Sequence, residues 1–307
     1  MAIIPDFPRA SSLAARLAES YWDVEFDGVI AVDPIALGYV LGAVGALDIG
    51  DGLTINQANA AQTLLNGIYL KYPDLATQAK AQDAAFENAA RRIFNALTAG
   101  RGDSVRALRA LVRGVQEDRI LLWSAHRSEQ ARIRSTGISG PMTDRQQPDR
   151  PQVGLYLTDM SQAKLDFYLH SEVRVEATRC YDDGVQDLVM TTTLTSDVPQ
   201  GVALPTSVTG FGSRSPIGVI GLSVRVMAPP GGEIRSIKID GKAAPVGSIE
   251  YRGRQLSRFT RFLEPGENSV IVTEFRSGRG MPGAPMLKAT PSAHPNDERV
   301  VGLSACA

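Results

Sequence analysis

The sequence predicts an α/β N-terminal domain followed by an all-β, immunoglobulin-like sandwich. Strand and helix patterns alternate up to about residue 150, helical periodicity disappears after residue 170, and turn signals then recur at short intervals. We place the boundary after residue 168, which gives an α/β domain over residues 1–168 and a β-sandwich domain over residues 169–307. A chain of 307 residues is long enough for two buried cores.

The clearest α/β element is "FDGVIAVDPIALGYVLGAVG". Val29 to Val32 form a short, β-branched apolar run, which is typical of a buried strand. Asp33 then has the position of a helix N-cap, Pro34 that of the first helical residue, and Gly45 ends the helix. A strand that leads directly into a helix is the basic module of α/β folds.

Two longer helices and a second strand complete this half. We expect one helix from about Leu75 to Leu97, another from Asp103 to about Glu117, and a strand at "RILLWS". In the second helix, apolar side chains at helical spacing predict the side that faces the core: Val105, Leu108, Leu111, Val112 and Val115.

The second half reads as short alternating strands. They are "EVRVEAT", "LVMTTTLT", "VIGLSVRVM", "EIRSIKI", "LSRFTRFL" and "NSVIVTEF". Turn pairs separate them, at Asp183-Gly184, Pro230-Gly231, Asp240-Gly241 and Pro265-Gly266. Strands of this length and spacing are typical of an antiparallel sandwich.

Composition and motifs argue against several function classes. A net charge of -1 argues against a nucleic-acid partner. No apolar run approaches the ~18–20 residues of a membrane span, and the N-terminal residues lack a signal-peptide pattern. The histidines, His126, His170 and His294, are scattered, so we expect no metal site. No nucleophile elbow or phosphate loop is present in the sequence.

One group of candidate site residues lies in "YLKYPDLATQAKAQD". Lysines and aspartates meet there at a helix–loop–helix junction, where they could contact a phosphate or substrate and a metal ion. The residues are Tyr69, Lys71, Asp74, Lys80 and Asp83. Surface ion pairs are the simpler explanation of the same residues.

A smaller candidate group lies in "YLTDMSQAKLDFYL", where Asp159, Lys164 and Asp166 crowd a short polar link. We interpret this stretch as two strands joined by a turn. On a strand that starts at Lys164, the side chains of Lys164, Asp166, Tyr168 and His170 share one face. That face is either a substrate surface or the solvent side of a half-buried strand.

Cys180 and Cys306 are the two cysteines of the chain. They are either unrelated thiols or a disulfide that ties the C-terminus to an early strand. A disulfide would place the protein in an oxidising compartment.

Several long motifs resemble the domain of unknown function 4012 family of actinobacterial envelope proteins. They are "PDFPRASSLAARL", "FDGVIAVDPIALGYVLGAVG", "LLNGIYLKYPD", "GLYLTDMSQAKLDFYL", "LPTSVTG", "APPGGEI", "IDGK" and "LEPGE". Cys180 and Cys306 fall where members tend to carry cysteines. Members are usually longer and begin with a membrane segment, so the resemblance implies an α/β domain incomplete at its N-terminus and a membrane tether in a full-length form.

The resemblance implies an extracytoplasmic protein of the cell envelope that binds or assembles cell-wall glycopolymers. A more distant similarity, over "FDGVIAVDPIALGYVLGAVG" and the following helices, is to the LytR–CpsA–Psr ligases. It implies the alternative of a phosphotransferase that acts on polyprenyl-pyrophosphate-linked substrates with Mg²⁺. The arginine-bearing segment of those ligases would fall near Tyr69 to Asp83, where this chain has Lys71 and Lys80 but no arginine. Lysine lacks the bidentate fork with which arginine holds phosphate. Whether the protein is an enzyme is left open, and outside the alternative we expect no cofactor.

Overall fold

The computed structural model describes residues 6–73, 75–142, 148–161, 163–212, 214–245 and 247–306. It divides the chain into two compact units. The first comprises Met1–Thr143 and Leu204–Val208, and the second comprises Asp144–Ala203 and Thr209–Ala307.

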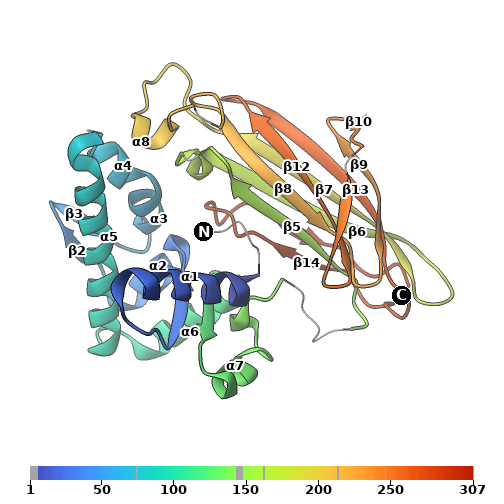
Figure 1. The fold of residues 1–307 in the computed structure, drawn as a ribbon, viewed down its shortest axis with the longest axis horizontal. Coiled ribbons are helices and arrows are strands. Elements are labelled where there is room, and N and C mark those ends of the chain that lie inside the picture. The colour runs from blue at the N-terminus through green and yellow to red at the C-terminus, as the bar shows by residue number, and fades with distance from the viewer. Residues whose placement is uncertain are drawn as a thin grey trace. The chain divides into compact units, whose positions relative to one another are not determined.

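The first unit is mostly helical, with two small sheets (Figure 1). Strands β1 and β4 pair antiparallel in one sheet, and β2 and β3 do so in the other. The elements in order are α1 (Phe7–Trp22), β1 (Gly28–Val32), α2 (Pro34–Val44), β2 (Leu47–Gly50), β3 (Leu53–Ile55), α3 (Ala60–Gln62), a π-helical turn (Thr63–Gly67), α4 (Ile68–Lys71), α5 (Leu75–Thr98), α6 (Ser104–Gln116), β4 (Ile120–Ser124), α7 (Arg127–Ile133), a 3-10 turn (Gly137–Ser139) and α8 (Thr206–Thr209).

The junction of β1 and α2 forms where its sequence predicts, but β1 is not the buried strand expected there, because among the described residues it pairs only with β4 and Ile30 is 69% exposed. The Asp33 carboxylate accepts a hydrogen bond from the backbone N–H of Ala36 at 2.8 Å, and Pro34 is the first helical residue. Gly45 ends the helix with φ of 91°, a conformation that favours glycine. The core of this part of the unit is built from apolar side chains of α2, β2, β3, the α3–α4 segment and α5, with Leu41, Ile49, Ile55 and Ile68 almost fully buried.

Helix α6 does not bury the side that its sequence predicts. Val105 and Leu108 are 58% and 62% exposed, and Leu111 and Val112 are exposed too. The helix instead packs through small residues: a Cβ on Gly114 would lie 2.6 Å from the Ile120 side chain of β4. Helix α6 therefore contacts its neighbours through small residues and not through its large apolar side chains. Of the predicted apolar side, only Val115 is partly buried.

The second unit consists mostly of strands (Figure 1). They are β5 (Gln152–Asp159), β6 (Leu169–Cys180), β7 (Gln186–Ser196), β8 (Ile220–Met227), β9 (Glu233–Ile239), β10 (Lys242–Ala243), β11 (Ser248–Tyr251), β12 (Arg254–Leu263), β13 (Asn268–Arg276), β14 (Met286–Ala289) and β15 (Arg299–Val301), with a 3-10 turn at Leu165–Tyr168.

These strands form two mixed sheets. One has the order β10-β9-β13-β7-β6-β15 and the other the order β11-β12-β8-β5-β14. Most neighbours are antiparallel, but β14 pairs parallel with β5 and β15 pairs parallel with β6. The C-terminal segment therefore supplies an edge strand to each sheet. An α/β region followed by a mostly β region fits the predicted composition.

The predicted hairpin around "YLTDMSQAKLDFYL" is wrong. Strand β5 pairs with β8 and β14, whereas β6 pairs with β7 and β15, so the two strands that flank the link belong to different sheets. Because β5 is an interior strand of the second unit, the boundary between the units lies near residue 144 rather than after residue 168.

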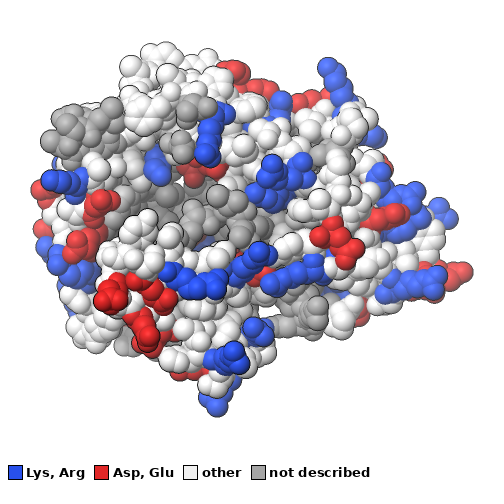
Figure 2. All heavy atoms as spheres, in the orientation of Figure 1, with Lys and Arg blue, Asp and Glu red and all other residues white. Residues whose placement is uncertain are grey.

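Alternation of side chains explains the core of the second unit. In β7 every second residue is buried, and Leu188, Met190 and Leu194 are fully so. Strand β8 is buried along its whole length, as expected for a strand covered on both faces. Over the described residues, no helix is both long and apolar enough to cross a membrane. Basic and acidic side chains are interspersed on the face seen in Figure 2, in keeping with the net charge of -1.

Candidate functional site

The first predicted group of residues lies on two consecutive helices: Tyr69 and Lys71 on α4, Lys80 and Asp83 on α5. Asp74 lies outside the described residues. The Tyr69 ring packs against Phe86 of α5, with ring centroids 6.0 Å apart, so its aromatic face serves helix packing.

The charged members of this group do not converge. Lys71 lies over the ring of Tyr72, 5.9 Å from its centroid, and the Tyr72 hydroxyl donates a hydrogen bond to Asp51 at 2.7 Å. That hydrogen bond raises the pKa of Tyr72 to about 12. In the described part of the chain no hydrogen bond or ion pair joins Lys71, Lys80 and Asp83 to one another. A phosphate or Mg²⁺ site there stays a prediction.

The second predicted group does come together, but not on a strand. Asp159 ends β5, and its Oδ1 accepts hydrogen bonds from the backbone N–H and hydroxyl of Ser161 at 2.9 and 2.5 Å. Lys164 and Asp166 lie at the start of the 3-10 turn that precedes β6. Since the strand begins only at Leu169, the predicted Lys–Asp–Tyr–His strand face does not form.

The environment of Asp166 disfavours its charge. Crowding by protein raises the pKa of this carboxyl, the negative charge of Asp159 adds to the effect, and Lys164 opposes it. The side chain nevertheless stays exposed to solvent, so the carboxyl is crowded rather than enclosed. We therefore regard this group as a charged turn at the end of a strand.

An ionic cluster in the first unit was not expected from the sequence. The buried Arg119 guanidinium pairs with Asp33 at 2.6 Å and Glu117 at 3.0 Å, and the Tyr39 hydroxyl donates to Glu117 at 2.7 Å. Burial raises the pKa of Asp33, against the opposing charge of Arg119. Arg113 lies over the Tyr39 ring, 3.9 Å from its centroid. These contacts fasten α2, α6 and β4 together, which is a structural role.

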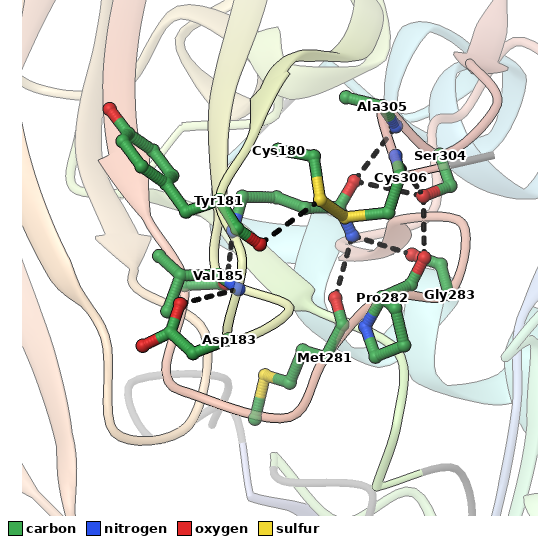
Figure 3. The surroundings of a disulfide bond; sticks show 12 residues. Cys180, Tyr181, Asp183, Val185, Met281, Pro282, Gly283, Ser304, Ala305 and Cys306 are labelled. Carbon is green, nitrogen blue, oxygen red and sulfur yellow. Dashed lines mark hydrogen bonds between the residues drawn. A yellow bond between two sulfur atoms is a disulfide. The ribbon is translucent and has the colours of Figure 1, made fainter.

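The two cysteines form a disulfide across 126 residues of sequence (Figure 3). The fully buried Gln186 amide lies beside it. Its nitrogen donates to the carbonyls of Met281 and Gly283 at 2.6 and 2.8 Å, and its oxygen accepts from Ser304 Oγ and the Ala305 N–H at 3.1 and 2.9 Å. All four hydrogen-bonding positions of the amide are thus filled. A disulfide of this kind is typical of an oxidising, extracytoplasmic compartment.

Two β-bulges lie at the same level of the six-stranded sheet. In β6 the pairing with β7 skips Thr178, between Ala177↔Leu188 and Arg179↔Asp187. In β9 the pairing with β13 skips Arg235, between Ser236↔Glu274 and Ile234↔Phe275. Leu188 and Phe275 are themselves partners across β7 and β13. The strands on either side of this central pair are therefore distorted at one row of the sheet.

A hollow of about 260 Å³ lies at this row. Both skipped residues line it, together with charged side chains from the central strands. The complete lining is Thr178, Asp187, Leu188, Val189, Arg235, Glu274, Phe275 and Arg276. Bulges redirect side chains and are common beside functional sites, so we take this double-bulge hollow as the candidate site.

The charges of the double-bulge hollow are partly paired. Arg276 donates from Nε to Asp187 Oδ1 at 2.8 Å and from Nη2 to the Tyr181 hydroxyl at 2.8 Å. The hydrogen bond from Arg276 lowers the pKa of Asp187, against the effect of burial, and that from Tyr181 acts in the same direction. Arg235 pairs with Glu233 at 2.8 Å. The arrangement can donate and accept hydrogen bonds, but it offers no nucleophile next to a base.

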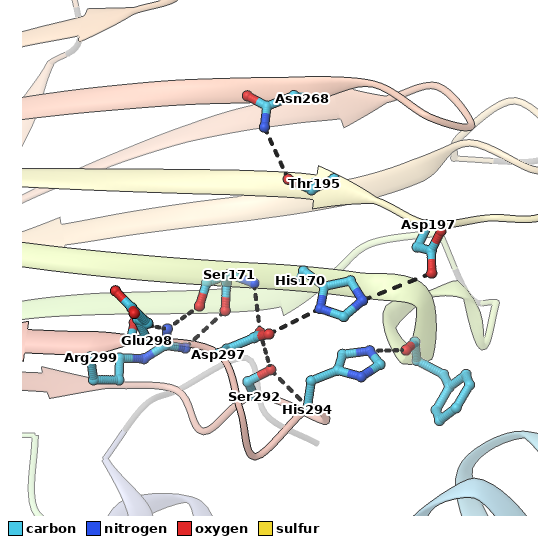
Figure 4. Close-up of polar contacts among 11 residues, drawn as sticks. His170, Ser171, Thr195, Asp197, Asn268, Ser292, His294, Asp297, Glu298 and Arg299 are labelled. Carbon is cyan, nitrogen blue, oxygen red and sulfur yellow. Dashed lines mark hydrogen bonds and ion pairs between the residues drawn. The ribbon is translucent and has the colours of Figure 1, made fainter.

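A second polar cluster holds the C-terminal segment against β6 (Figure 4). The Asp297 carboxylate faces His170 Nδ1 at 2.9 Å and accepts from the Ser171 N–H at 2.8 Å and from Ser292 Oγ at 2.5 Å. The His294 ring stacks on that of His170 with centroids 3.8 Å apart.

This histidine cluster has the residue types of a catalytic triad but not its geometry. The Ser292 hydroxyl donates to Asp297 rather than to a histidine, so no imidazole is placed to activate it. His294 Nε2 lies 2.7 Å from the carbonyl of Phe167, an acceptor, so this nitrogen carries its hydrogen. Among the described residues no group of three or more His, Cys, Asp or Glu is arranged to hold a metal ion.

Sequence reasoning missed the double-bulge hollow. Its residues come from four strands, and a register shift between strands leaves no pattern of its own in sequence. The one available signal was the run of alternating strands itself, which locates the sheet but not its irregular row.

The fold and this site define a protein with an internal disulfide, in which an α/β region precedes a mostly β unit with a polar hollow. The family model described as "Protein of unknown function (DUF4012)" matches residues 1–69, which supports the resemblance over that segment. No curated protein matches the chain.

Two solved structures show a limited likeness. One is of a protein from Legionella pneumophila described as a candidate nutrient binding protein, with 8% identity over 46% of this chain and 55% of that chain and a TM-score of 0.26. The other is the M1 zinc metallopeptidase from Deinococcus radiodurans, with 13% identity over 46% of this chain and 24% of that chain and a TM-score of 0.18. The chain thus spans about half of the first neighbour and a quarter of the second, and scores this low carry no functional argument.

Proposed function

We propose that the protein acts outside the cytoplasm, in the cell envelope, as a non-catalytic module that binds cell-wall glycopolymers. The observation that carries the proposal is the double-bulge hollow on a sheet whose C-terminal segment is fixed by a disulfide. The proposal includes the immunoglobulin-like arrangement expected for the β unit and a membrane tether in a full-length form.

The disulfide supports the compartment. Such bonds persist in oxidising environments and are rare in the cytosol. Cys180 and Cys306 pair with each other, and the buried Gln186 amide binds the same C-terminal segment, so the bond belongs to the fold rather than to an exposed redox pair.

The site supports binding rather than catalysis. Its volume of about 260 Å³ lies just below the ~300–1,000 Å³ usual for drug-sized ligands, which suits one unit of a polymer. Its polar groups are donors and acceptors held on strands, which position side chains rigidly. No observation favours the phosphotransferase alternative, because Lys71, Lys80 and Asp83 are not joined into a site in the described part of the chain.

The proposal is tested by sedimentation of the full chain, with its disulfide intact, with purified cell walls. One wall sample keeps its glycopolymers and the other is stripped of them. We expect the protein to sediment with the first sample and to stay in solution with the second. Equal sedimentation with both, or none with either, would contradict the proposal.

A pair of variants locates the surface responsible. Arg235→Glu reverses a charge inside the double-bulge hollow. Arg174→Glu reverses a charge at an exposed position of β6 outside the hollow. We expect Arg235→Glu to lower the bound fraction about fivefold or more and Arg174→Glu to leave it unchanged. Equal losses would show that the contact depends on overall charge and not on the hollow.

A further inference from the structure

We infer that the double-bulge hollow takes an uncharged, hydroxyl-rich sugar unit rather than a phosphate or carboxylate group. The inference rests on the proposed function, since it names the chemistry of the polymer that the hollow would bind. It follows from the charges of the lining residues, from the hydrogen bonds they already make, and from the size of the hollow.

The hollow has no excess of positive charge. Two arginines, Arg235 and Arg276, face two carboxylates, Asp187 and Glu274. An anion that entered would gain attraction from the arginines and repulsion from the carboxylates at similar range, so its net attraction would be small.

The arginines are also already engaged. Arg276 directs Nε and Nη2 to Asp187 and to the Tyr181 hydroxyl, and Arg235 directs Nη1 to Glu233. Tight phosphate and carboxylate sites use the planar arginine fork for two parallel hydrogen bonds to the ligand. At Arg276 an anion would have to displace Asp187 to receive both of them on the Nε–Nη2 edge.

Acceptors, in contrast, remain available. No hydrogen bond or ion pair in the described part of the chain occupies the half-buried Glu274 carboxylate. Asp187 accepts from Arg276 and Tyr181, which leaves part of its acceptor capacity open. Sugar hydroxyls donate to such carboxylates and can accept in turn from the remaining arginine N–H groups.

A cation is a poorer match for the same carboxylates. Hard cations need several oxygen ligands around one point. Asp187 is bound to Arg276, and both arginines lie in the same hollow, so a metal ion would meet two positive charges there. The size of the hollow, about 260 Å³, instead suits a single ring.

The test compares three soluble probes by calorimetry with the full chain: mannan as a neutral polysaccharide, polyglycerol phosphate as a phosphate polymer and polygalacturonate as a carboxylate polymer. We expect mannan to bind, and its affinity to change little between low and physiological salt because exposed charges contribute little. The two anionic polymers should bind at least tenfold more weakly than mannan.

Glu274→Gln decides between the ligand classes by the sign of its effect. The amide keeps the shape of the side chain but replaces a charge-assisted hydrogen bond by a neutral one, so affinity for mannan should fall about fivefold. An anionic ligand would instead bind more tightly to this variant, because a repulsive charge is gone. Glu172→Gln, at an exposed position of β6 outside the lining, is the matched control. It should change neither the affinity for mannan nor that for the anionic polymers.

The outcomes separate this inference from the proposed function. Tighter binding of either anionic polymer, strengthened by Glu274→Gln, would overturn the inference and leave wall binding intact. Failure of all three probes, with sedimentation on whole walls retained, would also overturn the inference alone. Loss of sedimentation on whole walls would overturn the proposed function itself.

Discussion

Gln186 holds the end of the C-terminal segment through its buried side-chain amide. Its buried amide fills four hydrogen bonds, three of them to backbone groups of residues 281, 283 and 305. Gln186→Ala would leave these buried or partly buried groups without that partner, which costs about 3 kcal/mol in the free energy of unfolding. Urea unfolding followed by fluorescence measures the loss.

The matched control is Gln200→Ala. The Gln200 amide donates to the carbonyl of Pro265 at an exposed position, where water can replace it. We expect a change of less than about 0.5 kcal/mol for this variant. Equal effects of the two substitutions would show that the Gln186 amide does not hold the segment.

Two aspartates of the second unit make its stability depend on pH. The hydrogen bond from Arg276 lowers the pKa of Asp187. At Asp297 burial acts to raise the pKa, but the hydrogen bonds from Ser292, Ser171 and His170 outweigh it and lower the value. A lowered pKa in the folded state stabilises the fold above the ordinary value of 3.8, and this contribution is lost as the pH falls below it.

The Tm of the second unit should therefore fall steeply between pH 5 and pH 2. Scanning calorimetry at fixed ionic strength measures this decline. Asp187→Asn and Asp297→Asn should each flatten that decline, because each removes one group whose proton uptake drives it. Asp182→Asn, at an exposed turn, is the control. A steep decline unaltered in both variants would contradict the assignment.

At the scale of elements, α6 shows the limit of periodicity. Its apolar stripe predicts a core-facing side, yet Leu108 is 62% exposed and Gly114 makes the close contact with Ile120. We expect Leu108→Ser to change the stability of the first unit by less than about 0.5 kcal/mol. A buried leucine such as Leu41 should lose about 2–5 kcal/mol on truncation to Ala. Comparable losses at both positions would restore the sequence-based expectation.

The disulfide between Cys180 and Cys306 ties the C-terminal segment to the end of β6. It closes a loop of 126 residues, which in the chain-entropy model stabilises the fold by roughly 4–5 kcal/mol. The double variant Cys180→Ser, Cys306→Ser should lower the Tm of the second unit and leave that of the first unit unchanged. Scanning calorimetry reads both, and a drop confined to the first unit would contradict the division into units.

Local sequence signals predicted most helices and strands, but they did not predict which strands pair with each other. The β1–α2 junction follows from Asp33, Pro34 and Gly45, which act on their immediate neighbours. The hairpin prediction failed because alternation reveals that β5 and β6 are strands but not which partners they have. The turn at Leu165–Tyr168, which separates the two sheets, has no glycine or proline to announce it.

For the whole molecule, the sequence predicted an α/β region followed by a mostly β region, but it did not predict the site. Helix and strand content could be read from the change of periodicity near residue 150. The double-bulge hollow needs Thr178 and Arg235 at one level of a sheet, and that depends on the registers of β6, β7, β13 and β9 together. Pairing of Cys180 with Cys306 was one of two interpretations of the sequence, and the structure shows that the two residues form a disulfide.

Binding of glycopolymer in the double-bulge hollow is tested most directly by chemical-shift mapping of the ¹⁵N-labelled chain during titration with solubilised wall glycopolymer. We expect the backbone amide signals of Thr178, Arg235 and Glu274 to shift progressively and those of Lys71 and Lys80 to stay unchanged. Shifts at Lys71 and Lys80 without any in the hollow, or no shifts at saturating polymer, would contradict binding in the hollow.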